Sequence, residues 1–200
     1  MSRRHKTQCY HFCVSRAGYV LVGGRSSRMG RDKALLPFRG ASLAQSVACA
    51  VTSAAGSAVL VGDPARYGNL GYPVIPDRYP EEGPLGGILT ALHHTSADWN
   101  LVAACDMPGL TADFLSQLLA AAERAGADAL VPTTPAGQLE PLCAVWHGRA
   151  RAALEGAFAG GIRQVSRALE ALPCCRYPVQ QVAQFQNVNT PEDWAGYAPE

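Results

Sequence analysis

Short apolar runs alternate with helix-forming segments along most of the chain, and this alternation constrains the fold most strongly. We predict strands at residues 17–22, 57–61, 72–75, 99–104, 127–131 and 142–146. We predict helices at residues 42–54, 84–94 and 111–125, and near 148–158 and 163–171. Ser42 and Thr111 suit helix N-caps, and Pro84 suits the first helical position. Because short uncharged strands that alternate with helices are typical of buried sheets, we expect an α/β fold with a mainly parallel sheet covered on both faces.

The chain is long enough for one domain with a sizeable core. Its 200 residues fit a single three-layer, Rossmann-like domain. We assign residues 17–198 to this domain and residues 1–16 to a loose N-terminal extension, which has basic residues but no apolar core and no cleavage signal. The net charge of +1 argues against nucleic acid or a membrane surface as a partner. No apolar stretch approaches the roughly 20 residues that a membrane helix needs.

The cysteines indicate the compartment rather than the chemistry. The chain has seven, an odd number without a secretory signal, which indicates reduced thiols and a cytoplasmic location. Cys49, Cys105 and Cys143 lie in apolar runs and are expected in the core. Cys174 and Cys175 are too close together for the usual pair of zinc ligands.

Polar groups and glycines follow four of the predicted strands. In open α/β sheets, ligands bind beyond the carboxyl ends of the strands. Those ends are Gly23-Gly24, Gly62-Asp63, Asp77 and Asp106, and their convergence on one edge predicts an active site. Simpler interpretations exist, because Asp106 suits a capping role before the helix at residue 111 and Asp77 suits a turn.

The first strand leads into a glycine-rich, basic loop, LVGGRSSRMGRDKALL, at residues 21–36. Glycines let backbone N–H groups approach a phosphate closely, and Arg25, Arg28 and Lys33 supply positive charge. The spacing fits neither a Walker A loop nor the dinucleotide-binding GxGxxG pattern. On chemistry alone, the loop is either a phosphate site or a solvated surface turn.

The whole string GGxSxRMGxDKALL resembles the signature loop of the molybdenum cofactor nucleotidyltransferases, which have the nucleotide-diphospho-sugar transferase type of fold. Further motifs similar to those of the family follow in order, and the resemblance extends from about residue 17 to the C-terminal helix. These motifs are VIPD at 74–77, EGPLGGI at 82–88, CDMP at 105–108, EPL at 140–142 and NVNTPED at 187–193.

The LVGG and GPLGG segments are most similar to the guanylyltransferase branch of this family. The resemblance implies transfer of GMP from GTP to Mo-molybdopterin, which forms the molybdopterin guanine dinucleotide cofactor and releases pyrophosphate. It also implies a Mg²⁺ ion and transient contact with proteins that insert or deliver the cofactor. Two alternatives share the fold: a relative that uses CTP, and a nucleotidyltransferase for a sugar phosphate. A nucleotide-binding module without catalysis is a third alternative.

The resemblance carries over to individual positions. It implies nucleotide contacts at Leu21, Val22, Gly23, Gly24, Lys33, Asp77 and Asp106. Lys33 and Arg28 would act as phosphate clamps, and Asp106 would hold Mg²⁺ because hard cations prefer carboxylate and phosphate oxygens. A substrate phosphate is already ionised, so no activated serine, cysteine or histidine is required.

Some positions remain open. Asn187 or Asn189 would either complete the metal shell or hold the pterin phosphate. Asp77 would contact either guanine N–H groups or ribose hydroxyls. Gly62 departs from the pattern, because guanylyltransferases can carry asparagine there, and Arg163 is a further candidate on the pterin side.

Overall fold

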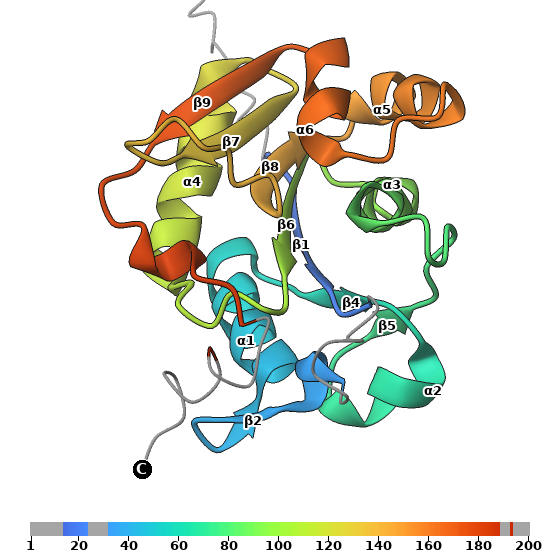
Figure 1. The fold of residues 1–200 in the computed structure, drawn as a ribbon, viewed down its shortest axis with the longest axis vertical. Coiled ribbons are helices and arrows are strands. Elements are labelled where there is room, and N and C mark those ends of the chain that lie inside the picture. Colours follow the sequence, from blue (N-terminus) through green and yellow to red (C-terminus); the bar gives the residue numbers. More distant parts are fainter. Residues whose placement is uncertain (1–13, 24–31, 189–192, 194–200) are drawn as a thin grey trace, which may run out of the picture.

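The computed structural model describes residues 14–23, 32–188 and 193. Within this part of the chain, a seven-stranded sheet has the order β5-β4-β1-β6-β8-β7-β9 (Figure 1). Its strands are β1 (Arg16–Leu21), β4 (Val59–Val61), β5 (Val74–Ile75), β6 (Trp99–Ala104), β7 (Ala129–Thr133), β8 (Cys143–His147) and β9 (Cys174–Pro178). Strand β8 runs antiparallel to β6 and β7, and every other pairing is parallel. The predicted mainly parallel sheet is therefore confirmed.

Helices cover both faces of the sheet, as the predicted three-layer architecture requires (Figure 1). One face carries α1 (Leu43–Ala55) and α4 (Ala112–Ala125), and the other carries α3 (Pro84–His94), α5 (Ala150–Ala159) and α6 (Val165–Ala168). Successive β1 residues alternate between the layers: Val20 packs in the α1–α4 cluster, whereas Tyr19 and Leu21 pack in the α3–α5 cluster. All six residues of β6 are buried, as expected for a central strand covered on both sides.

The predicted helix starts are confirmed. Ser42 and Gln45 form a capping box at α1, in which each side chain accepts a hydrogen bond from the other residue's N–H. The Thr111 hydroxyl accepts the N–H of Phe114 at the start of α4, and Pro84 begins α3. Among the described residues, no helix is long and apolar enough to cross a membrane.

Several short elements were not predicted. Pro37–Phe38 (β2) and Ala41–Ser42 (β3) form a hairpin, and Cys174–Pro178 (β9) adds a strand at the edge of the main sheet. A short helix, α2 (Pro64–Tyr67), follows β4. Three 3₁₀ turns were not predicted either: η1 (Lys33–Leu35), η2 (Gly68–Leu70) and η4 (Ala183–Phe185). A further 3₁₀ turn, η3 (Leu169–Ala171), directly follows α6 within the helix that was predicted near residues 163–171.

Two expectations need correction or adjustment. Cys105 and Cys143 are buried as predicted, but Cys49 is exposed because it lies on the outer side of α1. Strand β1 begins at Arg16, one residue before the expected domain boundary, and the Arg16 guanidinium pairs with Glu123 on α4. Residues 1–13 of the expected extension lie outside the described residues.

Candidate functional site

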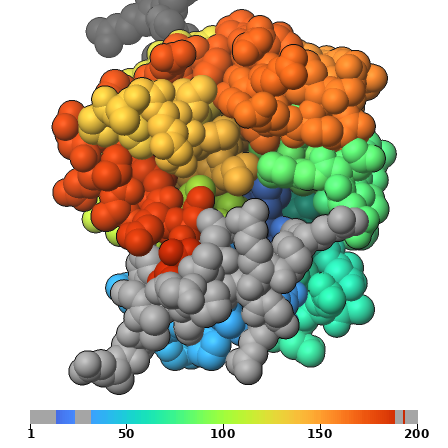
Figure 2. Space-filling view, in the orientation of Figure 1, coloured from blue at the N-terminus to red at the C-terminus, as the bar shows by residue number. Residues whose placement is uncertain are grey.

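A cavity of about 740 Å³ lies at the carboxyl ends of β1, β4, β5 and β6. In Figure 2 it appears as a recess between the green atoms of α3 and the yellow atoms of the β7–β8 region, with blue atoms of the first strand at its floor. Its lining residues are Leu21, Gly23, Lys33, Val61, Gly62, Asp63, Pro64, Pro76, Asp77, Pro80, Glu81, Gly83, Pro84, Gly87, Ala104, Cys105, Asp106 and Leu142. The predicted convergence of the strand ends on one edge is confirmed.

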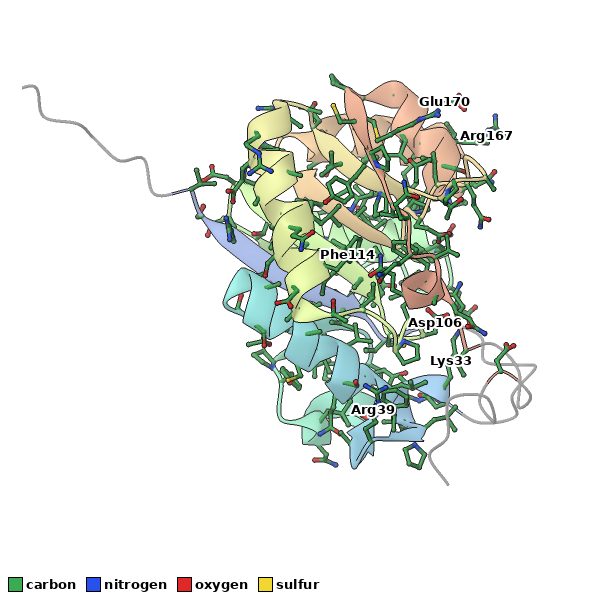
Figure 3. All side chains as sticks on the ribbon, turned by 90° about the vertical axis from the view of Figure 1, so that its left-hand side faces the viewer. Lys33, Arg39, Asp106, Phe114, Arg167 and Glu170 are labelled. Carbon is green, nitrogen blue, oxygen red and sulfur yellow. The ribbon has the colours of Figure 1, made fainter. Side chains whose placement is uncertain are left out.

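Lys33 and Asp106 form an ion pair in this cavity, although 73 positions separate them in the sequence. Figure 3 shows the two side chains together at the same end of the sheet, where Lys33 Nζ lies 2.5 Å from Asp106 Oδ2. Both are largely shielded, with side-chain exposures of 21% and 13%. The other carboxylate oxygen, Asp106 Oδ1, is buried and accepts no hydrogen bond from the described residues. A buried carboxylate oxygen without a partner is costly, and a cation would satisfy it.

The backbone around Asp106 explains why this side chain is held in place. Cys105 N–H donates to Leu21 O at 3.1 Å, which continues the pairing of β6 with β1. Val188 N–H donates to Asp106 O at 2.9 Å, so the C-terminal segment closes on the same residue. Thr111, not Asp106, caps α4, and the simpler interpretation of Asp106 as a helix cap is therefore wrong.

Lys33 begins a 3₁₀ turn whose start is fixed by its neighbour. Asp32 Oδ1 accepts the N–H of Ala34 at 3.1 Å, and Asp32 O accepts the N–H of Leu35. Ala34 is buried in the core, which leaves the Lys33 side chain directed to the cavity. The exit of the basic loop is thus a capped turn and not an irregular coil.

Asp77 occupies the cavity wall after β5 and also organises the following turn. Its Oδ1 accepts hydrogen bonds from the N–H of Tyr79 at 3.0 Å and from the hydroxyl of Thr90 at 2.8 Å. Its Oδ2 makes no hydrogen bond within the described part of the chain. The turn interpretation of Asp77 is therefore correct for one oxygen, while the other remains available to a ligand.

The three glycines of GPLGG serve two purposes, an unusual backbone conformation at Gly83 and close packing at Gly86 and Gly87. Gly83 has φ 84° and ψ 179°, which an L side chain disfavours, and it precedes α3 without a side-chain cap. A Cβ at Gly86 would lie 2.8 Å from Tyr79 Cβ, and a Cβ at Gly87 would lie 3.0 Å from Leu21 Cδ2. The uncapped start of α3 therefore packs directly against the cavity floor, where its N–H groups and dipole favour an anion.

Cys105 is the cavity residue that most resembles a nucleophile, but its environment suppresses that role. Complete burial, and next the charge of Asp106, raise the pKa of this thiol to about 12. A thiol with such a pKa remains protonated at neutral pH and reacts poorly. Among the described residues, the site therefore offers carboxylates and an amine for binding charge, and no thiolate for covalent catalysis.

The remaining residues predicted for the site do not line the cavity or lie outside the described residues. Val22 packs in the core and does not line the cavity, so only its backbone is placed for a ligand. Asn187 also lies outside the cavity lining; its buried Oδ1 lacks a hydrogen-bond partner in the described chain, one residue from the Val188 bond to Asp106. Gly24, Arg28 and Asn189 lie outside the described residues.

Arg163 is engaged by its own chain. Its Nε lies 2.5 Å from Glu82 Oε2, and its guanidinium stacks 3.8 Å from the centre of the Phe158 ring. These contacts join the loop before α3 to the end of α5. The structure thus gives Arg163 a role in holding that loop.

Sequence reasoning missed several cavity residues. Glu81 places a further carboxylate on the wall, and Leu142 supplies an apolar contact from the start of β8. Asp63, by contrast, was named among the predicted strand ends and does line the cavity. Glu81 has φ 66°, an unusual value for a residue other than glycine, and no sequence signal indicates it.

Comparison with known proteins gives consistent matches along the chain. The sequence model of the MobA-like NTP transferase domain matches residues 18–173. A probable molybdenum cofactor guanylyltransferase of Deinococcus radiodurans is 34% identical over 88% of this chain and 90% of its own length. The molybdenum cofactor guanylyltransferase of Xanthomonas euvesicatoria is 36% identical over 89% of this chain and 92% of its own. A crystal structure of molybdopterin-guanine dinucleotide biosynthesis protein A from Archaeoglobus fulgidus has a TM-score of 0.78 at 32% identity, covering 90% of this chain and 96% of that one.

Proposed function

The chain belongs to the MobA-like NTP transferase family, and from this membership we propose that it is a molybdenum cofactor guanylyltransferase. It transfers GMP from GTP to Mo-molybdopterin, forming the guanine dinucleotide cofactor and pyrophosphate. Its fold is that of the nucleotide-diphospho-sugar transferases. The observation that carries the proposal is the Lys33–Asp106 pair at the strand ends, beside a cavity large enough for a nucleotide.

The reaction joins two anions, and this fact determines what the residues must do. A phosphate oxygen of molybdopterin attacks the α-phosphorus of GTP, the new P–O bond forms, and the bond to the bridging oxygen breaks as pyrophosphate leaves. The nucleophile is already ionised, so no general base is needed. Repulsion between the anions is the barrier, and positioning together with fixed positive charge lowers it.

Lys33 supplies such a charge. Its ammonium is a compact point charge on a flexible stem, so it can follow the phosphoryl group as bonds change. Asp106 holds the ammonium within 2.5 Å, and the capped turn at Asp32 fixes its backbone. We propose Arg28 as a second clamp on the basis of its position in the loop.

We propose Mg²⁺ as the metal, held by Asp106. The family typically uses a divalent ion, and the unpartnered Oδ1 of Asp106 fits a hard cation. No cluster of three or more metal-binding side chains occurs among the described residues, so phosphate oxygens and water would complete the shell. The ion, when bound, would neutralise charge on the triphosphate. Asn187 and Asn189 remain candidates for this shell or for the pterin phosphate.

The nucleotide is proposed to lie on the side of β1, β4 and β5. Leu21, Gly23 and Gly87 bring backbone close to the cavity, and the free oxygen of Asp77 is available to guanine N–H groups or to ribose hydroxyls. The acceptor would then lie toward β6 and β8. We also place the reaction in the cytoplasm, because all five cysteines in the described chain are free thiols.

A direct assay tests the proposal. The protein is incubated with Mg²⁺, either GTP, CTP or UTP, and either Mo-molybdopterin or a sugar 1-phosphate, and the product is identified by mass. We expect the guanine dinucleotide and one pyrophosphate per product. A cytidine dinucleotide would assign the chain to the CTP-using branch, and pyrophosphate release with a sugar 1-phosphate would assign it to the sugar class. GTP binding without turnover would indicate a binding module and contradict the proposal.

A further inference from the structure

We propose that Tyr67 is a positioning residue for the transfer reaction: its hydroxyl, acting through Asp32, fixes the turn that presents Lys33 to Asp106. The inference rests on the proposed function and extends it to a residue in none of the predicted motifs. Tyr67 ends α2, the short helix after β4, and is 3% exposed. Its hydroxyl donates to Asp32 Oδ2 at 2.8 Å across 35 positions of sequence.

Both oxygens of Asp32 are therefore committed, each to a different element. Oδ1 caps the 3₁₀ turn through the N–H of Ala34, and Oδ2 accepts the Tyr67 hydroxyl. The Arg66 guanidinium also lies 3.8 Å from Oδ2, but its side chain is 65% exposed and contributes little. Asp32, the residue that precedes Lys33, thus links α2 to the 3₁₀ turn that carries Lys33.

Gly62 makes room for this link. A Cβ at position 62 would lie 2.9 Å from Tyr67 Cε2 and 2.8 Å from Val22 Cγ2. A side chain there and the tyrosine ring in its present place are mutually exclusive. The departure from asparagine at this position therefore has a physical cause: the ring of Tyr67 fills the space beside the end of β4.

The hydroxyl is a constant donor. Burial, followed by the bond to Asp32, raises the pKa of Tyr67, so its proton stays in place throughout the pH range of an assay. The α2 backbone that carries it is fixed as well, since Asp63 Oδ1 caps the helix through the N–H of Ala65. Misplacing a catalytic group by about 1 Å can cost roughly 100-fold in rate, so loosening the turn without removing it should cost about tenfold.

The test uses Tyr67→Phe, which removes the hydroxyl and keeps the ring. Lys6 and Lys33 are the chain's two lysines, so the acylation of Lys33 by an N-hydroxysuccinimide ester can be followed by peptide mass without any substrate. We expect Lys33 to acylate several-fold faster in Tyr67→Phe than in the wild type. In the transfer assay we expect kcat to fall about tenfold while KM for GTP stays within about twofold.

Tyr19→Phe is the matched control. Tyr19 is also buried, at 1% exposure, and its hydroxyl is 3.0 Å from His94 Nδ1 at the end of α3, away from the cavity lining. Removal of the Tyr19 hydroxyl should lower the free energy of unfolding but leave both the rate of Lys33 acylation and kcat unchanged. An effect on Lys33 as large as that of Tyr67→Phe would show that any buried hydroxyl matters, and would overturn the proposal.

A double-mutant cycle with Asp32→Ala tests the route of the effect. If the hydroxyl acts through Asp32, adding Tyr67→Phe to Asp32→Ala should change neither readout further. A full additional loss, an unchanged acylation rate in Tyr67→Phe, or an unchanged kcat there would each overturn the proposal. If the wild type forms no guanine dinucleotide, the proposed function fails separately, and the acylation rates alone decide whether Tyr67 positions Lys33.

Discussion

Asp77 and Asp106 lie at the same edge of the sheet, after two strands that β4 and β1 separate, and their hydrogen bonds differ. Asp106, after β6, has one oxygen 2.5 Å from Lys33 Nζ and a second, buried oxygen without a partner among the described residues. Asp77, after β5, has one oxygen that accepts hydrogen bonds from the Tyr79 N–H and the Thr90 hydroxyl. Asp106 therefore pairs with Lys33 through one oxygen and offers the other to a metal ion, whereas one oxygen of Asp77 is already used by its own turn. A carboxylate at a strand end can thus either bind a ligand or stabilise the following turn, and its hydrogen-bond partners show which role it has.

The largest effect should come from Asp106→Asn. Asparagine keeps the size and an acceptor for Lys33 but loses the charge that holds a divalent ion, so transfer should fall by about 100- to 1000-fold. Steady-state rates with GTP and Mo-molybdopterin provide the measurement. Asp98→Asn is the control, because Asp98 precedes the same strand and bonds Ser15 at the opposite edge. A parental rate in Asp106→Asn would remove the difference between the two aspartates.

Asp77→Asn should act on binding. The amide oxygen can keep the bonds to Tyr79 and Thr90, while the charge offered to the nucleotide is lost. We expect KM for GTP to rise about tenfold, equivalent to about 1.4 kcal/mol, with kcat within about threefold. If kcat instead falls as far as in Asp106→Asn, Asp77 takes part in the chemical step and the comparison fails.

Thr90→Val should have the smallest effect. Thr90 is 2% exposed, and its hydroxyl bonds Asp77 and accepts the N–H of Arg78 at 3.0 Å. Its removal should lower the free energy of unfolding by about 1 kcal/mol, measured by urea denaturation, and raise KM for GTP about twofold. Thr52→Val is the matched control, since the Thr52 hydroxyl donates to the Ala48 carbonyl of its own helix and, within the described chain, bonds no cavity residue. Equal KM values in the two variants would show that Asp77 is positioned without Thr90.

Much of the fold follows from local signals. The six residues of β6 and the eleven of α3 lie at the predicted positions, because an uninterrupted apolar run and a proline-led helix are strong local patterns. Strand β9 was missed because CCRYP shows no clear alternation of apolar and polar residues. The antiparallel direction of β8 was also missed, although the connection from Thr133 to Cys143 is too short for a crossover helix, which was a usable signal.

The residues of the site likewise fall into those that the sequence predicts and those that only the folded structure reveals. Asp106 and Asp77 were predictable, because the carboxyl ends of strands are where α/β proteins place ligands. Tyr67 was not, because its importance depends on a ring that meets Gly62 and a hydroxyl that reaches Asp32, both of which are contacts of the folded chain. Local sequence reports which groups arrive at the edge, and only the packing reports which of their atoms are still unsatisfied.

Strand β8 is antiparallel to β6, so the cavity wall beside these strands is formed by a connection between strands. Because β8 starts at the edge where β6 ends, Leu142 reaches the cavity from the beginning of a strand, and its carbonyl accepts the N–H of Ala104 at 2.8 Å. The wall on that side is therefore part of a hairpin connection and not of a βα crossover. Its length and side chains can be exchanged without moving a helix, so this half of the cavity can diversify while the β1–β4–β5 half stays fixed.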